Sequence, residues 1–107
     1  GTGFFLGKPQ ADAKAFFDAG AKVAIASDYN PGSCHCDNLL LVASLAAPTY
    51  KMNIAQLWSA ITLNASHALN LKSQGALIPG LKPRFTIFDV DNIDKITYHW
   101  GANLCIR

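Results

Sequence analysis

Asp28 stands where α/β enzymes carry a catalytic carboxylate. It follows the apolar run 22–27 and begins the turn Asp-Tyr-Asn-Pro-Gly-Ser at 28–33. Loops at the carboxyl ends of strands commonly bear metal ligands and catalytic groups. A carboxylate there can hold a metal ion and take a proton from an attacking water. The pattern therefore indicates active-site chemistry, with a simple turn or helix cap by Asp28 as the alternative.

Three further residues of the turn are suited to hold an anionic ligand. The Asn30 amide can donate two hydrogen bonds, and the Ser33 hydroxyl can donate or accept. Gly32 leaves the backbone N–H groups open to close approach by an anion. Asn-Pro-Gly also forms ordinary tight turns. Both interpretations can hold at once.

Three motifs carry a resemblance to a known family. Ser-Asp-Tyr-Asn-Pro-Gly-Ser at 27–33 is similar to the signature after the last barrel strand of imidazolonepropionases, amidohydrolase-superfamily enzymes of histidine breakdown. Thr-Leu-Asn-Ala-Ser-His-Ala-Leu-Asn-Leu at 62–71 resembles the superfamily pattern Thr-x-Asn-Ala-Ala-x-Ala-Leu-Gly-Leu. Tyr-His-Trp-Gly-Ala-Asn at 98–103 is similar to the family's closing Tyr-x-Phe-Gly-x-Asn. The first motif is specific to the family, and the second only to the superfamily.

The resemblance implies a reaction and a role for each residue of the turn. The reaction is hydrolysis of 4-imidazolone-5-propanoate, a small-molecule substrate, to N-formimino-L-glutamate. Asp28 would be both a metal ligand and the catalytic group that moves a proton from the attacking water to the leaving nitrogen. Asn30 and Gly32 would hold the formiminoglutamate-like end, and Ser33 would contact substrate. The implied cofactor is a divalent metal, zinc or iron, whose histidine ligands are expected outside this chain.

The residues just after the turn depart from the family pattern. The family usually has Ser and Pro where this chain has Cys34 and His35. Cys34 and Cys36 are closer together than ligands of structural zinc sites usually are, and a second ligand pair is missing. The odd number of three cysteines does not predict a disulfide framework, so reduced thiols are expected. A contact between His35 and substrate remains open.

The length bears on the fold that the resemblance implies. An eight-stranded β/α barrel needs about 250 residues, whereas this chain has 107 and no initiating Met. The expected class is α/β: the last βα unit or units of an amidohydrolase TIM barrel, followed by short strands of the accessory β-sandwich domain. Residues 1–72 are assigned to the barrel, with its final strand at about 22–27, and residues 73–107 to the sandwich. We expect a piece of a longer enzyme, inactive alone.

Local signals predict three helices and two further short strands. The helices are expected over about 9–20, from a cap at Asp37 or Asn38 to 47, and over 53–69, and the strands over 85–88 and 96–98. Pro48 is expected to end the second helix. Asn53 and Gln56 have the spacing of a capping box at the start of the third helix. The run 22–27 is apolar at nearly every position, as expected of a parallel strand covered on both faces.

Composition restricts the partners. Hydrophobic residues make up 50% of the chain and charged residues only 15%, below the usual ~25%. This predicts surfaces that are covered by the rest of a barrel or by a second subunit, and hence a homo-oligomer, a dimer by the resemblance. The nine basic residues are spread singly, which does not indicate nucleic-acid binding. The longest apolar stretch, 39–47, is shorter than the ~20 residues of a membrane span, so a cytoplasmic protein is expected.

Two other functions remain open. Another amidohydrolase, such as a nucleobase deaminase or other aminohydrolase relative, would share the helix motif and the Asp at the strand end. Asn-Pro-Gly-Ser at 30–33, together with the closing motif at 98–103, favours imidazolonepropionase. A non-catalytic assembly module would keep the turn as a scaffold.

Overall fold

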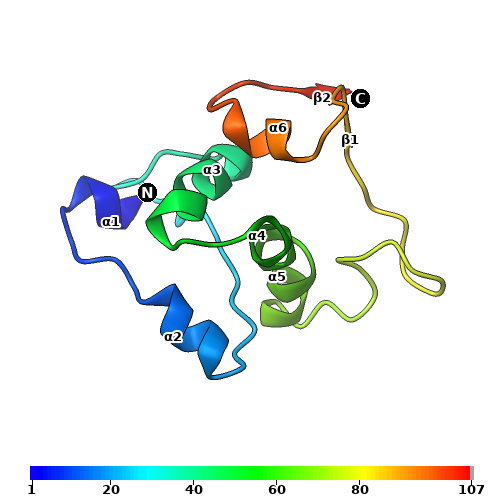
Figure 1. The fold of residues 1–107 in the computed structure, drawn as a ribbon, viewed down its shortest axis with the longest axis horizontal. Helices are drawn as coiled ribbons and strands as arrows, with labels where there is room; N and C mark the ends of the chain where they lie inside the picture. The colour runs from blue at the N-terminus through cyan, green and yellow to red at the C-terminus, as the bar shows by residue number, and fades with distance from the viewer. Residues whose placement is uncertain (107) are drawn as a thin grey trace.

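The chain is mostly helical, with one small antiparallel sheet near its C-terminus (Figure 1). The computed structural model describes residues 1–106; Arg107, the last residue of the expected sandwich portion, lies outside the described residues. The elements in chain order are α1 (Thr2–Phe5), α2 (Ala13–Asp18), α3 (Leu39–Thr49), α4 (Ile54–Ile61), α5 (Leu63–Ala68), β1 (Ile87–Phe88), α6 (Asp94–Tyr98) and β2 (Cys105–Ile106).

Side-chain caps determine where three of the helices begin. Asp12 and Asn38 each accept a hydrogen bond from the backbone N–H three residues later, at the starts of α2 and α3. Asn53 and Gln56 form the predicted capping box of α4, with each side chain accepting from the other residue's backbone N–H. Such caps satisfy backbone N–H groups that the first turn of a helix leaves without partners. The predicted starts of α3 and α4 are therefore confirmed.

Two helix ends differ from the predictions. Pro48 lies inside α3, which continues to Thr49. The cost is small in the last turn, where proline removes one backbone bond and Tyr50 N still donates to Ala46 O. The predicted third helix is divided into α4 and α5 at Thr62, whose φ and ψ are −125° and −89°.

The segment 22–27, expected as the last barrel strand, has no regular secondary structure. A strand requires a hydrogen-bonded neighbour, and no part of residues 1–106 pairs with this segment as a strand. Its backbone is held by α4 and α5 instead: Ile25 N donates to Ala60 O at 3.1 Å, and Asn64 Nδ2 donates to Val23 O at 2.9 Å. Residues 23, 25 and 27 are half-buried, but residues 22, 24 and 26 are exposed. Only one face is covered, so the expectation of two covered faces is wrong for this structure.

The strand predicted at 96–98 is also wrong, because these residues belong to α6. Ile96 and Thr97 are both buried where α6 packs against α3. Neighbouring residues of a strand point to opposite faces, so a strand could not bury both against one helix. The strand predicted at 85–88 is shorter than expected, and β1 pairs antiparallel with β2 in the register Ile87 to Ile106 and Phe88 to Cys105. No parallel sheet occurs among the described residues.

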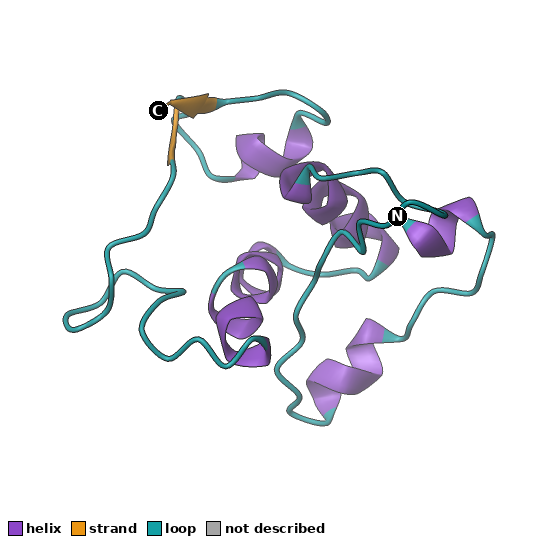
Figure 2. Cartoon of the chain, turned by 180° about the vertical axis from the view of Figure 1, so that it is seen from behind, coloured by secondary structure: helices purple, strands orange, loops and turns teal. Residues whose placement is uncertain are grey.

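A small core is built mainly from α3 and α4, and Figure 2 shows the helices, joined by loops, that surround it. Its buried members are Ala43, Ala46, Met52, Leu57 and Ala60. Phe17 of α2 and Ile25 of the irregular segment pack against this cluster. The core therefore links the first third of the chain to the central helices.

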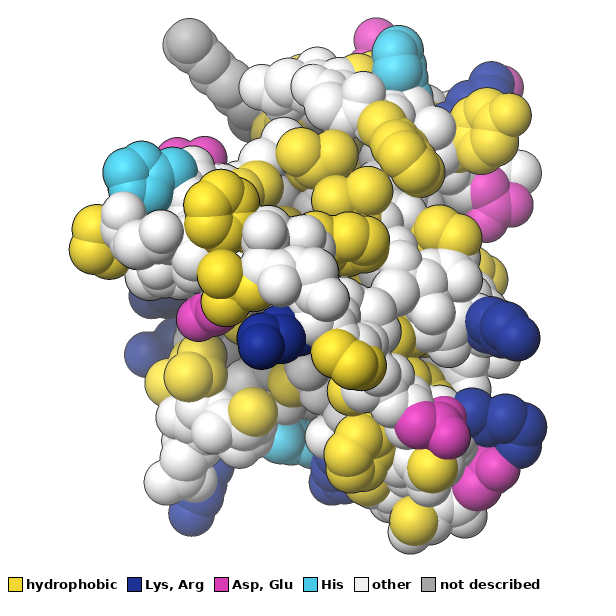
Figure 3. All heavy atoms as spheres, turned by 90° about the vertical axis from the view of Figure 1, so that its left-hand side faces the viewer, with side chains coloured by type: hydrophobic (Ala, Val, Ile, Leu, Met, Phe, Trp, Pro, Cys, Tyr) yellow, Lys and Arg dark blue, Asp and Glu magenta, His cyan; other side chains and the backbone are white. Residues whose placement is uncertain are grey.

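Many large apolar side chains remain on the surface, and several are visible across one face in Figure 3. Phe5 is 70% exposed and Tyr98 is 87% exposed. These side chains agree with a surface that other protein covers, although the predicted self-association stays a prediction. Within residues 1–106, no helix combines the length and the apolar character needed to cross a membrane.

Leu57→Ala should lower the free energy of unfolding by about 2–5 kcal/mol, because it opens a cavity in the core. Leu57 is 1% exposed. The matched control is Leu69→Ala, at a leucine that is 71% exposed. This variant should change the free energy of unfolding by less than about 0.5 kcal/mol. Urea unfolding followed by circular dichroism measures both. Equal losses in the two variants would contradict this description of the core.

Candidate functional site

Asp28 directly follows the segment 22–27 and is the first residue of the predicted turn. Asp28 has a φ of 54°, in the left-handed region. Aspartate and asparagine adopt this conformation more readily than most other residues. Its carboxylate is exposed. The residue thus both redirects the backbone and presents an acidic group to solvent.

Backbone hydrogen bonds between Asn30 and Cys34 close the turn just after Asp28. Asn30 and Cys34 form an antiparallel bridge, with Asn30 N donating to Cys34 O at 2.8 Å and Cys34 N to Asn30 O at 3.4 Å. The buried Cys34 thiol donates to Ser27 O at 3.1 Å. These contacts fasten the end of the turn to the residue that precedes Asp28.

The side-chain amide of Asn30 organises the inside of the turn. Its Oδ1 accepts from Gly32 N at 3.0 Å and from Ser33 N at 2.8 Å. Its Nδ2 donates to Asp28 O at 2.7 Å and to Thr2 Oγ1 at 3.3 Å. Asparagine commonly forms such bonds to backbone two or three residues on, which makes a turn rigid. The two N–H bonds of the amide are thus used within the protein.

Thr2 of α1 joins the predicted site residues to one another. Its hydroxyl donates to Asp28 Oδ2 and accepts from Asn30 Nδ2 and, at 3.2 Å, from Ser33 Oγ. Asp28, Asn30, Gly32 and Ser33 therefore lie together in one hydrogen-bonded turn. The sequence analysis missed Thr2, because a threonine between two glycines, 26 positions before Asp28, carries no local signal of this contact.

Tyr29 and His35 stack beside the turn, with ring centroids 5.7 Å apart and planes inclined by 24°. Tyr29 is 60% exposed, and His35 is also exposed. The pair forms an aromatic surface next to the turn. The stacking sets the position of the His35 ring, and a contact between His35 and substrate stays a prediction.

The described residues do not hold a metal ion by themselves. Catalytic zinc and iron sites take three or more protein ligands. Within the part of the chain that the structure describes, no group of three or more His, Cys, Asp or Glu side chains could hold a metal. Cys34, Cys36 and Cys105 are free thiols. Asp28 can supply one carboxylate, and no chemical step through a metal follows from this geometry.

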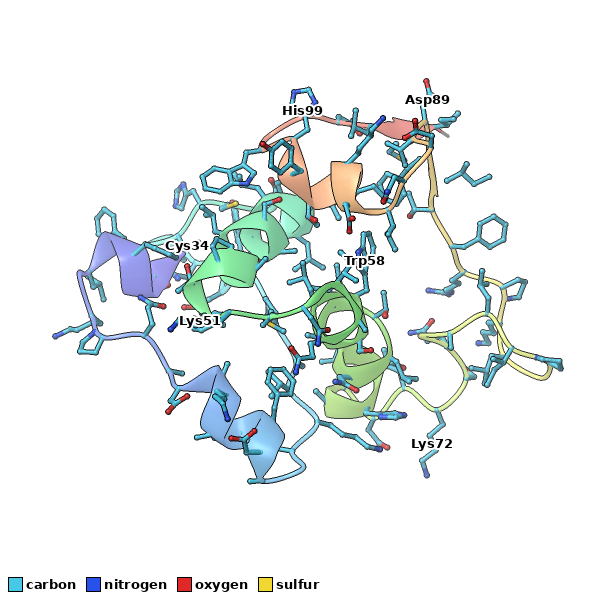
Figure 4. All side chains as sticks on the ribbon, in the orientation of Figure 1. Cys34, Lys51, Trp58, Lys72, Asp89 and His99 are labelled. Carbon is cyan, nitrogen blue, oxygen red and sulfur yellow. The ribbon has the colours of Figure 1, made fainter. Side chains whose placement is uncertain are left out.

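A largely apolar cavity of about 530 Å³ lies next to the turn and does not include its polar residues. Residues 23–26 line it together with side chains from α1, α2 and α3. Figure 4 shows Cys34 between the ribbons of α1 and α3 in this view. Asp28, Asn30, Gly32 and Ser33 do not line the cavity. The polar turn is therefore an open surface beside an apolar hollow.

Comparisons with known proteins agree with the resemblance seen in the motifs. The sequence profile of the amidohydrolase family matches residues 5–104. The imidazolonepropionase of Staphylococcus saprophyticus is 42% identical over 104 residues, which cover 96% of this chain and 25% of that protein. The imidazolonepropionase of Staphylococcus aureus strain JH9 is 40% identical over 103 residues, 95% of this chain and 25% of that protein. The chain thus spans about a quarter of the length of these relatives.

Asn30→Ala should loosen the turn, because it removes the acceptor of the Gly32 and Ser33 N–H groups. Amide hydrogen exchange at both positions should become about 10-fold faster, the loss of one hydrogen bond each. Asn92→Ala is the matched control, since Asn92 Oδ1 accepts only the Asp94 N–H among the recorded bonds. Nuclear magnetic resonance would resolve the amides. Unchanged exchange at Gly32 and Ser33 in Asn30→Ala would contradict the role of this side chain.

Proposed function

The chain belongs to the amidohydrolase family, and from this premise we propose that it is part of a hydrolase that opens the cyclic amide of 4-imidazolone-5-propanoate. The product would be N-formimino-L-glutamate. The relatives named imidazolonepropionase support the proposal, as does the turn that brings together the four predicted site residues. Because the chain spans a quarter of those relatives, the reaction is proposed for a protein that includes this sequence.

The single observation that carries the proposal is the exposed Asp28 carboxylate, held by the hydroxyl of Thr2. In the proposed reaction, a water oxygen attacks the ring carbonyl carbon and the carboxylate of Asp28 accepts the proton. The bond from that carbon to the ring nitrogen then breaks, and Asp28 delivers the proton to the nitrogen. One group thus acts first as base and then as acid.

The remaining residues of the turn are proposed to bind the anionic end of the substrate. Ser33 is the most adaptable of them, because its hydroxyl lies 3.2 Å from both Thr2 Oγ1 and Asn30 Oδ1 and can turn from either. Asn30 would exchange its bond to Thr2, 3.3 Å long, for one to the ligand. Gly32 is exposed and leaves room for close approach. The turn would thus recognise a carboxylate beside the reacting ring.

The amidohydrolase family generally depends on metal, and we propose a divalent ion, zinc or iron, for this protein. Asp28 would be one of its ligands. The described residues do not provide the others, and histidines from other parts of a longer protein are proposed in their place. We further propose a cytoplasmic homodimer without nucleic-acid or membrane partners.

Two alternatives would account for the same turn. A nucleobase deaminase or other aminohydrolase would release ammonia from its substrate, whereas the proposed reaction releases none. A non-catalytic assembly module would turn over neither kind of substrate. The printed names of the relatives favour the imidazolone reaction.

Asp28→Asn should lower kcat for 4-imidazolone-5-propanoate roughly 100- to 10,000-fold, because the amide cannot accept the proton. Asparagine also tolerates a φ of 54°, so circular dichroism should show an unchanged fold. Asp37→Asn is the matched control, at an exposed aspartate outside the turn. The loss of imidazolone absorbance measures the rate. Full activity of Asp28→Asn would contradict the proposal, as would equal losses in the two variants.

A further inference from the structure

We propose that Thr2 is a positioning residue whose hydroxyl fixes the direction of the Asp28 carboxylate for the reaction. This inference rests on the proposed function. Thr2 matches no part of the motifs that point to the site, and it lies 26 positions before Asp28. It reaches the site because the start of α1 lies against the turn, with Gly1 next to Cys34.

The groups around Thr2 favour the Asp28 carboxylate as the acceptor of its proton. Asn30 Nδ2 can only donate, and it approaches Thr2 Oγ1 at 3.3 Å. Ser33 Oγ lies 3.2 Å from the same oxygen and 3.2 Å from Asn30 Oδ1, and its one proton can be donated to either. An ionised carboxylate can only accept. The charged carboxylate is the strongest acceptor within reach, so the Thr2 proton is directed at Asp28 Oδ2.

This arrangement distinguishes the two oxygens of the carboxylate. Oδ2 accepts from Thr2, whereas the structure records no partner for Oδ1 among residues 1–106. Oδ1 remains available to take a proton at the exposed surface of the turn. Threonine is suited to this task, because its branched side chain has few rotamers and holds the hydroxyl in place.

Close packing at the start of α1 brings Thr2 to the turn. A Cβ placed on Gly1 would lie 2.0 Å from Cys34 Sγ. Any larger residue at this position would therefore push the start of α1 away from the turn. Cys34 is itself fixed, because its thiol donates to Ser27 O and its backbone bridges Asn30. Gly1 and Cys34 thus set the distance between Thr2 and Asp28.

The test compares Thr2 variants in the protein that carries this sequence, with 4-imidazolone-5-propanoate as substrate. Thr2→Val keeps the branched shape without the hydroxyl, and Thr2→Ala removes the hydroxyl without adding bulk. Each should lower kcat roughly 10- to 100-fold, as misplacement of a catalytic group does, and change KM by less than about threefold. Thr2→Ser should restore kcat to near the wild-type value.

Two further variants separate positioning from general stability. Thr49→Val is the matched control, because Thr49 Oγ1 donates to Leu45 O within α3 at 2.7 Å; it should leave kcat unchanged. Gly1→Ala keeps the hydroxyl but displaces it, so kcat should fall as in Thr2→Val. Wild-type kcat in either folded Thr2 variant that lacks the hydroxyl would overturn the inference. A wild-type protein that leaves the substrate intact would instead overturn the proposed function.

Discussion

The hydrogen bonds of two side chains, Asn30 and Thr2, determine the shape of the turn on which the site depends. Asn30 bonds to the backbone on both sides of the turn, and Thr2 attaches the turn to α1. Both side chains have all their N–H and O–H groups bonded within the protein, as polar groups in an ordered turn generally do. Asp28 can therefore be exposed and still have a defined direction.

A second constraint explains why the fold contains so little sheet. Backbone N–H and C=O groups need partners, and the segment 22–27 finds only a few, on α4 and α5. Its opposite side is uncovered, next to the cavity of about 530 Å³. An apolar segment whose backbone N–H and C=O groups are mostly unpaired is suited to pairing with further strands. The position of Asp28 at its end agrees with the proposal that the sequence functions within a larger enzyme.

Local features were predictable from the sequence, whereas features that depend on distant residues were not. The cap of Asn53 and Gln56 and the turn around Asn30 depend on residues within a few positions of one another, and their signals were read correctly. The predicted strand at 22–27 does not form, because a strand needs a hydrogen-bonded neighbour. The predicted strand at 96–98 is a helix instead, because packing against α3 outweighs the β-rich composition of these residues. Thr2 was missed because its contact with Asp28 spans 26 positions.

The most direct test of the central claim is to assay the wild-type protein that carries this sequence against two substrate classes. One assay follows the loss of 4-imidazolone-5-propanoate and the appearance of N-formimino-L-glutamate, and the other follows ammonia release from cytosine and guanine. We expect hydrolysis of the imidazolone without ammonia release from either base. Ammonia release from a nucleobase, with the imidazolone left intact, would contradict the account.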